Sequence, residues 1–181
     1  MDEERISLRA FLSGNNTEEE LRRLIAHFAD TAKYIADRLR EPIIGELKSK
    51  NAYGETQKKL DVWADEKIEK KLSQETTFGV KGIASEEGGE IKNLKTRANS
   101  DGRYSVTVDP LDGSSLIDKN LSIGTIFGIY EGKILDDEKP ARDRMRAAMY
   151  FLSGPATTMM LTAGRGTHQF LLNRVGTWVL D

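Results

Sequence analysis

The sequence predicts a layered α+β fold, of the α/β/α type, in which helices pack against a β-sheet. Residues 21–39 repeat apolar side chains at helical spacing, whereas residues 104–108 and 121–130 alternate β-forming side chains. Residues 147–180 add short apolar runs that are separated by glycine-rich turns. A helical period combined with several strand-like segments is typical of a sheet covered by helices.

The composition indicates one globular domain and argues against several kinds of partner. The chain has 181 residues, of which 38% are hydrophobic and 31% charged, with a net charge of -2. So small a charge provides no broad basic field, and we therefore expect neither nucleic acid nor a membrane as partner. The chain contains no cysteine, so its chemistry must use oxygen atoms rather than a thiolate or a disulfide.

The chain carries no recognisable targeting segment. No apolar run reaches the length of about 18 residues that a membrane span needs. The acidic start, residues 1–4, also lacks the basic region of a secretory signal. We therefore expect the chain to reside in the cytoplasm.

A long amphipathic helix is expected first. Asn16 or Thr17 can cap it, three glutamates at residues 18–20 suit its first turn, and Pro42 ends or kinks it. Its apolar stripe comprises Leu21, Leu24, Ile25, Phe28, Ala32, Ile35, Ala36 and Leu39.

A second helix is expected after a short further segment at residues 43–50 and a turn at residues 51–54. This helix begins near Asp61, so that Asp61 and Asp65 lie one turn apart on one face. Its apolar positions are Leu60, Val62, Trp63, Ile68 and Leu72.

The remainder of the chain reads as strands and their connections. Residues 78–85 form a strand that feeds Glu86 and Glu87, whose side chains would point apart if the strand continued through them. Residues 91–103 are polar and predict a solvent loop, and the charged residues 131–146 predict a surface excursion. The other expected strands are residues 104–108, 121–130, 147–152, 156–162, 169–172 and 178–180.

An acidic turn joins the two central strands and is the main candidate site. Pro110 makes Asp109 extended, and Gly113 allows close approach of a ligand, so Asp109 and Asp112 converge on one point. Paired carboxylates suit Mg2+, and the donors of residues 113–115 suit a phosphate. The alternative is an ordinary Asp-Gly turn with an N-capping serine.

Three ordered blocks carry a resemblance to a known family. Residues 109–115, Asp-Pro-Leu-Asp-Gly-Ser-Ser, continue through residues 122–130 in a pattern that resembles the signature of class I fructose-1,6-bisphosphatase. This family lies within the inositol-monophosphatase-like, lithium-sensitive phosphatases. Residues 58–62 and 84–87 stand in the order and approximate spacing that the family shows. The resemblance implies the layered α/β/α sugar-phosphatase fold, represented by its N-terminal half only.

The resemblance also implies roles for particular residues. The expected cofactor is Mg2+, two or three ions per site, with Mn2+ as a possible substitute. The metal ligands would be Glu86, Asp109, Asp112 and the Leu111 carbonyl; the catalytic residues Glu87 and Asp61; the substrate-binding residues Asp112, Gly113, Ser114 and Ser115; and an effector pair Arg103 and Tyr104.

The implied activity is Mg2+-dependent hydrolysis of fructose 1,6-bisphosphate to fructose 6-phosphate and phosphate, in gluconeogenesis. By the same resemblance we expect a homotetramer or homodimer. One alternative is an inositol-phosphate or other sugar-phosphate phosphatase. A second is a truncated, non-catalytic assembly subunit.

The resemblance has local and global departures. Glu55 stands where the family more often has aspartate, and Leu116 stands where many relatives have asparagine. Residues 1–181 correspond to the metal-binding N-terminal domain, without the C-terminal domain that binds the sugar phosphate. We therefore expect impaired activity in this short chain, and an exposed apolar face formed by Phe170, Leu172, Trp178 and Leu180.

Overall fold

The protein is built on one large, mostly antiparallel sheet. The computed structural model describes residues 5–40, 46–50, 56–74, 79–93, 102–135 and 139–181. Eight strands follow in the order β10-β9-β8-β7-β6-β5-β3-β4, in which only the β3–β5 pair is parallel, and β1 and β2 form a separate pair. The strands are β1 Glu46–Lys50, β2 Thr56–Lys58, β3 Val80–Ser85, β4 Ile91–Asn93, β5 Tyr104–Asp112, β6 Ile123–Glu131, β7 Met145–Ser153, β8 Thr157–Thr162, β9 His168–Leu172 and β10 Trp178–Leu180.

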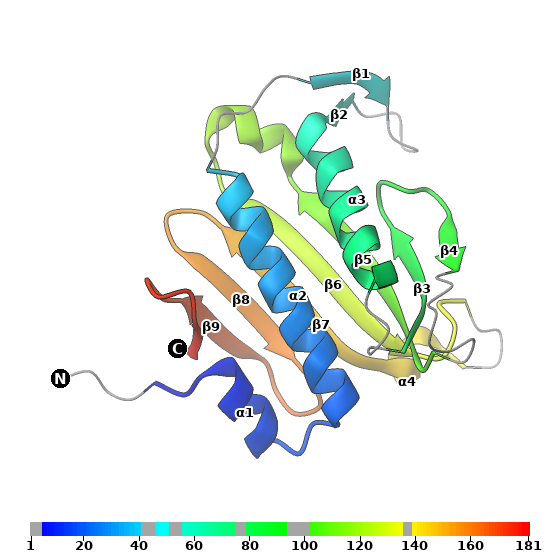
Figure 1. Cartoon of the computed structure of the whole chain (residues 1–181), viewed down its shortest axis with the longest axis vertical. Helices are drawn as coiled ribbons and strands as arrows, with labels where there is room; N and C mark the ends of the chain where they lie inside the picture. Colours follow the sequence, from blue (N-terminus) through cyan, green and yellow to red (C-terminus); the bar gives the residue numbers. More distant parts are fainter. Residues whose placement is uncertain (1–4, 41–45, 51–55, 75–78, 94–101, 136–138) are drawn as a thin grey trace.

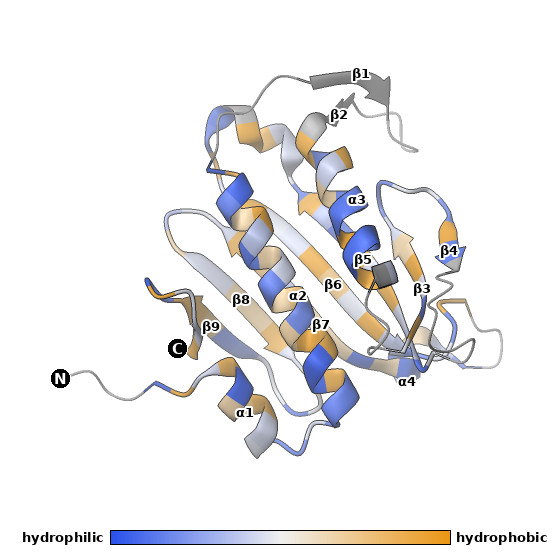
Figure 2. Ribbon diagram, in the orientation of Figure 1, coloured by the Kyte–Doolittle hydropathy of each residue, from blue (hydrophilic) through white to orange (hydrophobic). Residues whose placement is uncertain are grey.

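Two long helices lie side by side across one face of this sheet (Figure 1). The helices are α1 Leu8–Gly14, α2 Glu19–Arg38, α3 Lys59–Gln74 and α4 Ala141–Arg144, with a 3-10 helix, η1, at Ser114–Lys119. Figure 2 shows alternating orange and pale segments along β5 and β6 beneath the helices, as expected for strands with one buried face. The predicted layered α+β class is therefore confirmed.

Helix α2 forms the centre of the core because its apolar stripe faces the sheet. Phe28 stacks on Phe127 of β6, with ring centroids 4.2 Å apart, and Phe127 meets Phe151 of β7 edge-on at 5.9 Å. The predicted cap is wrong: Glu18 is the N-cap residue and makes no side-chain capping bond. Glu18 is instead held by Arg103 and Tyr104, so tertiary contacts position this helix end.

Helix α1 was not predicted, and it corrects the expectation of an exposed apolar face. The Ser7 hydroxyl accepts a hydrogen bond from the Ala10 N–H and begins the helix. The α1 ring of Phe11 then packs edge-on against Phe170, with centroids 5.3 Å apart. Trp178 donates from Nε1 to the Ala29 carbonyl at 3.2 Å. Phe170 and Trp178 are consequently buried, while Leu172 and Leu180 pack partly buried against the core.

The less covered face of the sheet carries the alternate side chains. Ile126 and Met160 are 39% and 37% exposed there, whereas their neighbours Phe127 and Met159 on the helix-covered face are completely buried. This exposed apolar surface lies over the central strands, away from the terminal strands where the sequence placed it.

Several element boundaries also differ from the predictions. Strand β5 continues through Asp109 to Asp112, and β4 forms within the expected loop. Predictions about Pro42, the turn at residues 51–54, Glu55 and Phe78 lie outside the described residues. None of the helices in the described ranges is long and apolar enough to cross a membrane.

Candidate active site

The acidic turn is an irregular end of β5 that leads directly into η1. Pairing with β6 shifts between Asp109, which faces Ile126, and Asp112, which faces Gly124. The Thr125 hydroxyl donates to the Pro110 carbonyl at 2.9 Å and fixes the irregular segment to β6. Gly113 then takes a left-handed conformation with φ of 81°, which glycine adopts without strain. The chain therefore leaves the strand at a defined point, with Asp112 exposed beside Gly113.

The carboxyl end of β3 lies beside this turn because β3 and β5 are parallel neighbours. Ser85 faces Val108 in the register, and the Glu86 N–H donates to the Val108 carbonyl at 2.9 Å. The strand ends at Ser85, as predicted, and does not continue through Glu86 and Glu87, so these two side chains do not alternate on it. Both glutamates lie in a turn and are half-buried. Parallel pairing nevertheless brings their backbone to the edge where Asp109 lies.

Asp61 reaches the site from the first turn of α3, which packs on β5. Asp61 is only 2% exposed. This is uncommon, because aspartates are rarely buried and first-turn residues usually face solvent. Leu60 and Ala64 beside it are core residues, so packing of α3 sets the depth of Asp61.

The electrostatics of Asp109 show that these acidic residues share one region. Burial, followed by the negative charge of Asp112, raises the pKa of Asp109 from 3.8 to about 6. Glu87 and Asp61 contribute smaller parts of this rise, and a hydrogen bond from the Leu111 backbone acts in the opposite direction. The fold thus brings together four of the predicted residues and leaves their negative charges in mutual repulsion.

Two further side chains, for which the sequence predicts no role, lie in the same region. Burial raises the pKa of Asp65, against a lowering contribution from the Ser85 hydroxyl, and Glu87 is among the charges that raise it. Tyr150 of β7 also has a raised pKa, first through burial and then through Asp112 and Asp109. The alternation of side chains along β7 predicts that Tyr150 lies on the face of the sheet away from the core. Its position near the acidic turn follows only from the order of the strands in the sheet.

The predicted metal ligands lie near one another but do not form a complete coordination site. Within the described ranges, no three acidic or histidine side chains are grouped closely enough to hold a metal ion as they stand. Asp112 is exposed and Asp109 half-buried, whereas Leu111 is buried at 5% exposure. The excess of carboxylates suits a divalent cation, which would have to draw these side chains together.

The predicted phosphate donors lie at the start of η1. Gly113 and Ser114 are half-buried and Ser115 is exposed. The Leu116 N–H donates to the Gly113 carbonyl at 2.8 Å and closes the first turn of the 3-10 helix. Leu116 packs partly buried against the core, and its Cδ1 lies 3.4 Å from the position that a Cβ atom at Gly113 would take. An apolar side chain therefore stands beside the turn where many relatives have an amide.

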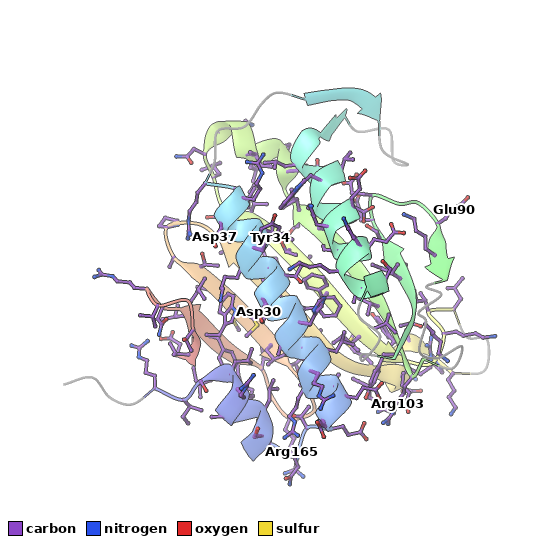
Figure 3. The ribbon with its side chains drawn as sticks, in the orientation of Figure 1. Asp30, Tyr34, Asp37, Glu90, Arg103 and Arg165 are labelled. Atoms are coloured by element: carbon purple, nitrogen blue, oxygen red, sulfur yellow. The ribbon has the colours of Figure 1, made fainter. Side chains whose placement is uncertain are left out.

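The predicted effector pair lies at the opposite end of β5, near the start of α2 (Figure 3). Arg103 binds Glu18 and Glu131, and the Tyr104 hydroxyl donates to Glu18 at 3.1 Å. Burial is the main reason that the pKa of Tyr104 rises to about 12. Glu18, Arg103 and Tyr104 line a hollow of about 520 Å³, together with Arg146 and Arg165. The pair is therefore well separated along the strand from the acidic turn.

Comparison with known proteins identifies the family. The family model "Fructose-1-6-bisphosphatase, N-terminal domain" matches residues 5–181. Class 1 fructose-1,6-bisphosphatases of Pelobacter propionicus and Methanocorpusculum labreanum are 40% and 42% identical, over 97% and 96% of this chain. The chain therefore belongs to the fructose-1,6-bisphosphatase family. It spans about half the length of these curated relatives, 52% and 51% respectively.

Solved structures agree with this assignment. The holo fructose-1,6-bisphosphatase of Leishmania major is 26% identical, with a TM-score of 0.83, covering 99% of this chain and 59% of that one. A putative sedoheptulose-1,7 bisphosphatase of Toxoplasma gondii has a TM-score of 0.81 over 97% of this chain and 58% of its own. At 22% identity, the second likeness concerns the fold alone.

Proposed function

We propose that this domain forms the metal-binding half of an enzyme that hydrolyses fructose 1,6-bisphosphate to fructose 6-phosphate and phosphate. The observation that carries the proposal is the meeting of the β3 and β5 ends, where Asp61, Glu87 and Asp112 all act on Asp109. Such a cluster of carboxylates is expected where a cation binds. The names of the class 1 relatives supply the substrate.

The fructose-bisphosphatase family generally uses a divalent metal ion, and we propose Mg2+, with Mn2+ as a substitute. Asp109, Asp112, Glu86 and the Leu111 carbonyl would hold it. Bound Mg2+ would polarise phosphate oxygens and lower the pKa of a water molecule. The oxygen-only donor set suits these hard cations better than softer metals.

The chain's own residues then divide the remaining work. Glu87 and Asp61 would accept and hold the proton of the attacking water, because both carboxylates lie within electrostatic range of Asp109. Gly113, Ser114 and Ser115 would donate to the reacting phosphate from the start of η1. The sugar would need contacts from a further part of the enzyme, since the acidic turn would bind only phosphate and metal.

Three further features belong to the same proposal. The enzyme would act in gluconeogenesis in the cytoplasm as a homotetramer or homodimer. Arg103 and Tyr104 would contribute to an effector site. An effector anion there would have to compete with Glu18 for Arg103, because Glu18 already binds this arginine.

Phosphate release from fructose 1,6-bisphosphate with Mg2+ tests the proposal. Two proteins should be compared: the 181-residue chain, and the same chain joined to the remaining half of the Pelobacter propionicus relative. Release by the joined protein that is lost in its Asp109→Asn variant is the expected result. Faster release from inositol 1-phosphate would favour the broader phosphatase alternative. A folded joined protein that hydrolyses neither ester would favour the assembly subunit.

A further inference from the structure

Tyr150 lies in a cross-strand row with an acidic residue of the site. In the β5–β6 register Asp109 faces Ile126, and in the β6–β7 register Ile126 faces Tyr150. Directly opposed residues on neighbouring strands share one face of a sheet. Asp109 and Tyr150 therefore project from the same face, across the exposed Ile126 and away from the helix-covered core.

The Tyr150 ring leans along this face toward Asp112. A Cβ atom added at Gly124 would lie 2.7 Å from Tyr150 Cε2, 3.0 Å from its hydroxyl and 3.1 Å from the Asp112 Cβ. Gly124 is the cross-strand partner of Asp112. The phenol and the Asp112 Cβ thus flank the space left free by the missing side chain of Gly124, and any larger residue at position 124 would have to displace them.

We infer that Tyr150 is a positioning residue of the acidic turn, whose hydroxyl holds Asp112 in place for a divalent cation across the gap left by Gly124. The inference rests on the proposed metal-binding function and adds a residue from a strand that carries no predicted ligand. A hydroxyl donor beside two carboxylates can fix one of them without adding negative charge. The raised pKa of Tyr150, caused by burial and then by Asp112 and Asp109, agrees with this placement.

A second glycine and tyrosine on the same face provide a matched control. A Cβ at Gly128 would lie 2.9 Å from Tyr130 Cε2 and 2.6 Å from the Thr107 hydroxyl. Gly128 faces Thr107 rather than an acidic residue. Substitutions at this second pair disturb the same sheet face to a similar degree, but they do not touch the acidic turn.

Isothermal titration of the 181-residue chain with Mn2+ tests the inference. Tyr150→Phe should raise the dissociation constant about tenfold, the effect of losing one hydrogen bond to a charged group. Tyr130→Phe should leave it unchanged, and thermal unfolding should show that both variants are folded. Gly124→Ala should also weaken binding, because it moves the ring without removing the hydroxyl, whereas Gly128→Ala should not.

A spectroscopic measurement separates positioning from a structural role. Addition of Mg2+ should perturb the ultraviolet difference spectrum of tyrosine in wild type and Tyr130→Phe, and this change should be lost in Tyr150→Phe. The inference alone would be overturned if Tyr150→Phe kept the wild-type Mn2+ affinity and still showed the Mg2+-induced spectral change, while Asp109→Asn abolished binding. Absence of Mn2+ binding in wild type would overturn both the inference and the proposed metal site.

Discussion

The two ends of β5 both carry clustered charged groups, but in opposite arrangements. At the start of the strand, Arg103 and Arg146 bind Glu131, and Arg103 also binds Glu18. At its end, Asp109 is half-buried among Asp112, Glu87 and Asp61. Hydrogen bonds from Arg146 and Arg103 lower the pKa of Glu131, whereas burial and like charge raise the pKa of Asp109 to about 6.

The difference separates ion-paired surface groups from a cluster of like charges that suits the proposed metal ion. Paired charges at a surface need nothing further, and each pair contributes little to stability. Clustered like charges oppose folding, and such a cluster in a packed region is a candidate site for a cation. The comparison therefore agrees with the proposed metal chemistry at the end of β5 and with a structural or proposed effector role at its start.

The largest expected effect comes from removing one carboxylate at the acidic end. In a phosphate-releasing protein that contains this domain, Asp109→Asn should lower kcat on the order of a hundredfold or more, as does loss of other electrostatic stabilisers. Glu131→Gln, which removes a carboxylate from the opposite end, should leave kcat nearly unchanged. Steady-state phosphate release measures both, and similar losses in the two variants would contradict the distinction between the ends.

The acidic end should also determine how stability depends on pH. Because the folded pKa of Asp109 is raised from 3.8 to about 6, the folded chain binds this proton more tightly than the unfolded chain. This contribution to the free energy of unfolding is full below the unfolded pKa and is lost as the pH rises through the folded value. Asp109→Asn should therefore gain stability relative to wild type across this window.

Urea unfolding without divalent metal, at several pH values spanning both pKa values, measures this difference. Glu131→Gln provides the control of opposite sign, since its folded pKa is lowered and its contribution is lost as the pH falls. A constant difference between Asp109→Asn and wild type over the window would show that Asp109 does not titrate as stated.

A smaller effect is expected at the buried tyrosine of the paired end. Tyr104→Phe removes the hydroxyl that donates to Glu18 at 3.1 Å, and should lower the free energy of unfolding by about 1 kcal/mol. Tyr34→Phe is the matched control because Tyr34 is 45% exposed on α2. Urea unfolding at neutral pH compares the two, and equal losses would mean that the bond to Glu18 adds nothing.

The smallest effect is expected from the exposed ion pairs. Arg103→Gln should cost less than about 1 kcal/mol, because the Arg103 and Glu18 side chains are 41% and 55% exposed. The loss should shrink further as salt screens the pairs. Arg142→Gln, at a more exposed pair, should change almost nothing. A salt-independent loss of several kcal/mol would show that Arg103 makes a large contribution to the stability of the domain.

Local patterns predicted most of the elements correctly. The apolar stripe of α2, the strands around the acidic turn and the terminal strands all follow from side-chain periodicity, which reports the face that each segment buries. The family followed from three short blocks, because the turn at residues 109–115 combines a proline, a glycine and two carboxylates in an uncommon order. Helix α1 escaped prediction since its seven residues present too few turns for a periodic signal.

The sequence by itself determined the layered fold, the family and the list of acidic residues, because each depends on residues that are close in the chain. Only the tertiary structure decided how those residues are arranged. Parallel pairing of β3 with β5 brings Glu87 to Asp109, packing of α3 buries Asp61, and the register of β7 places Tyr150 over Gly124. These contacts join segments far apart in sequence. The pKa shifts of Asp109 and Tyr150 arise from burial and neighbouring charge, which no local pattern specifies.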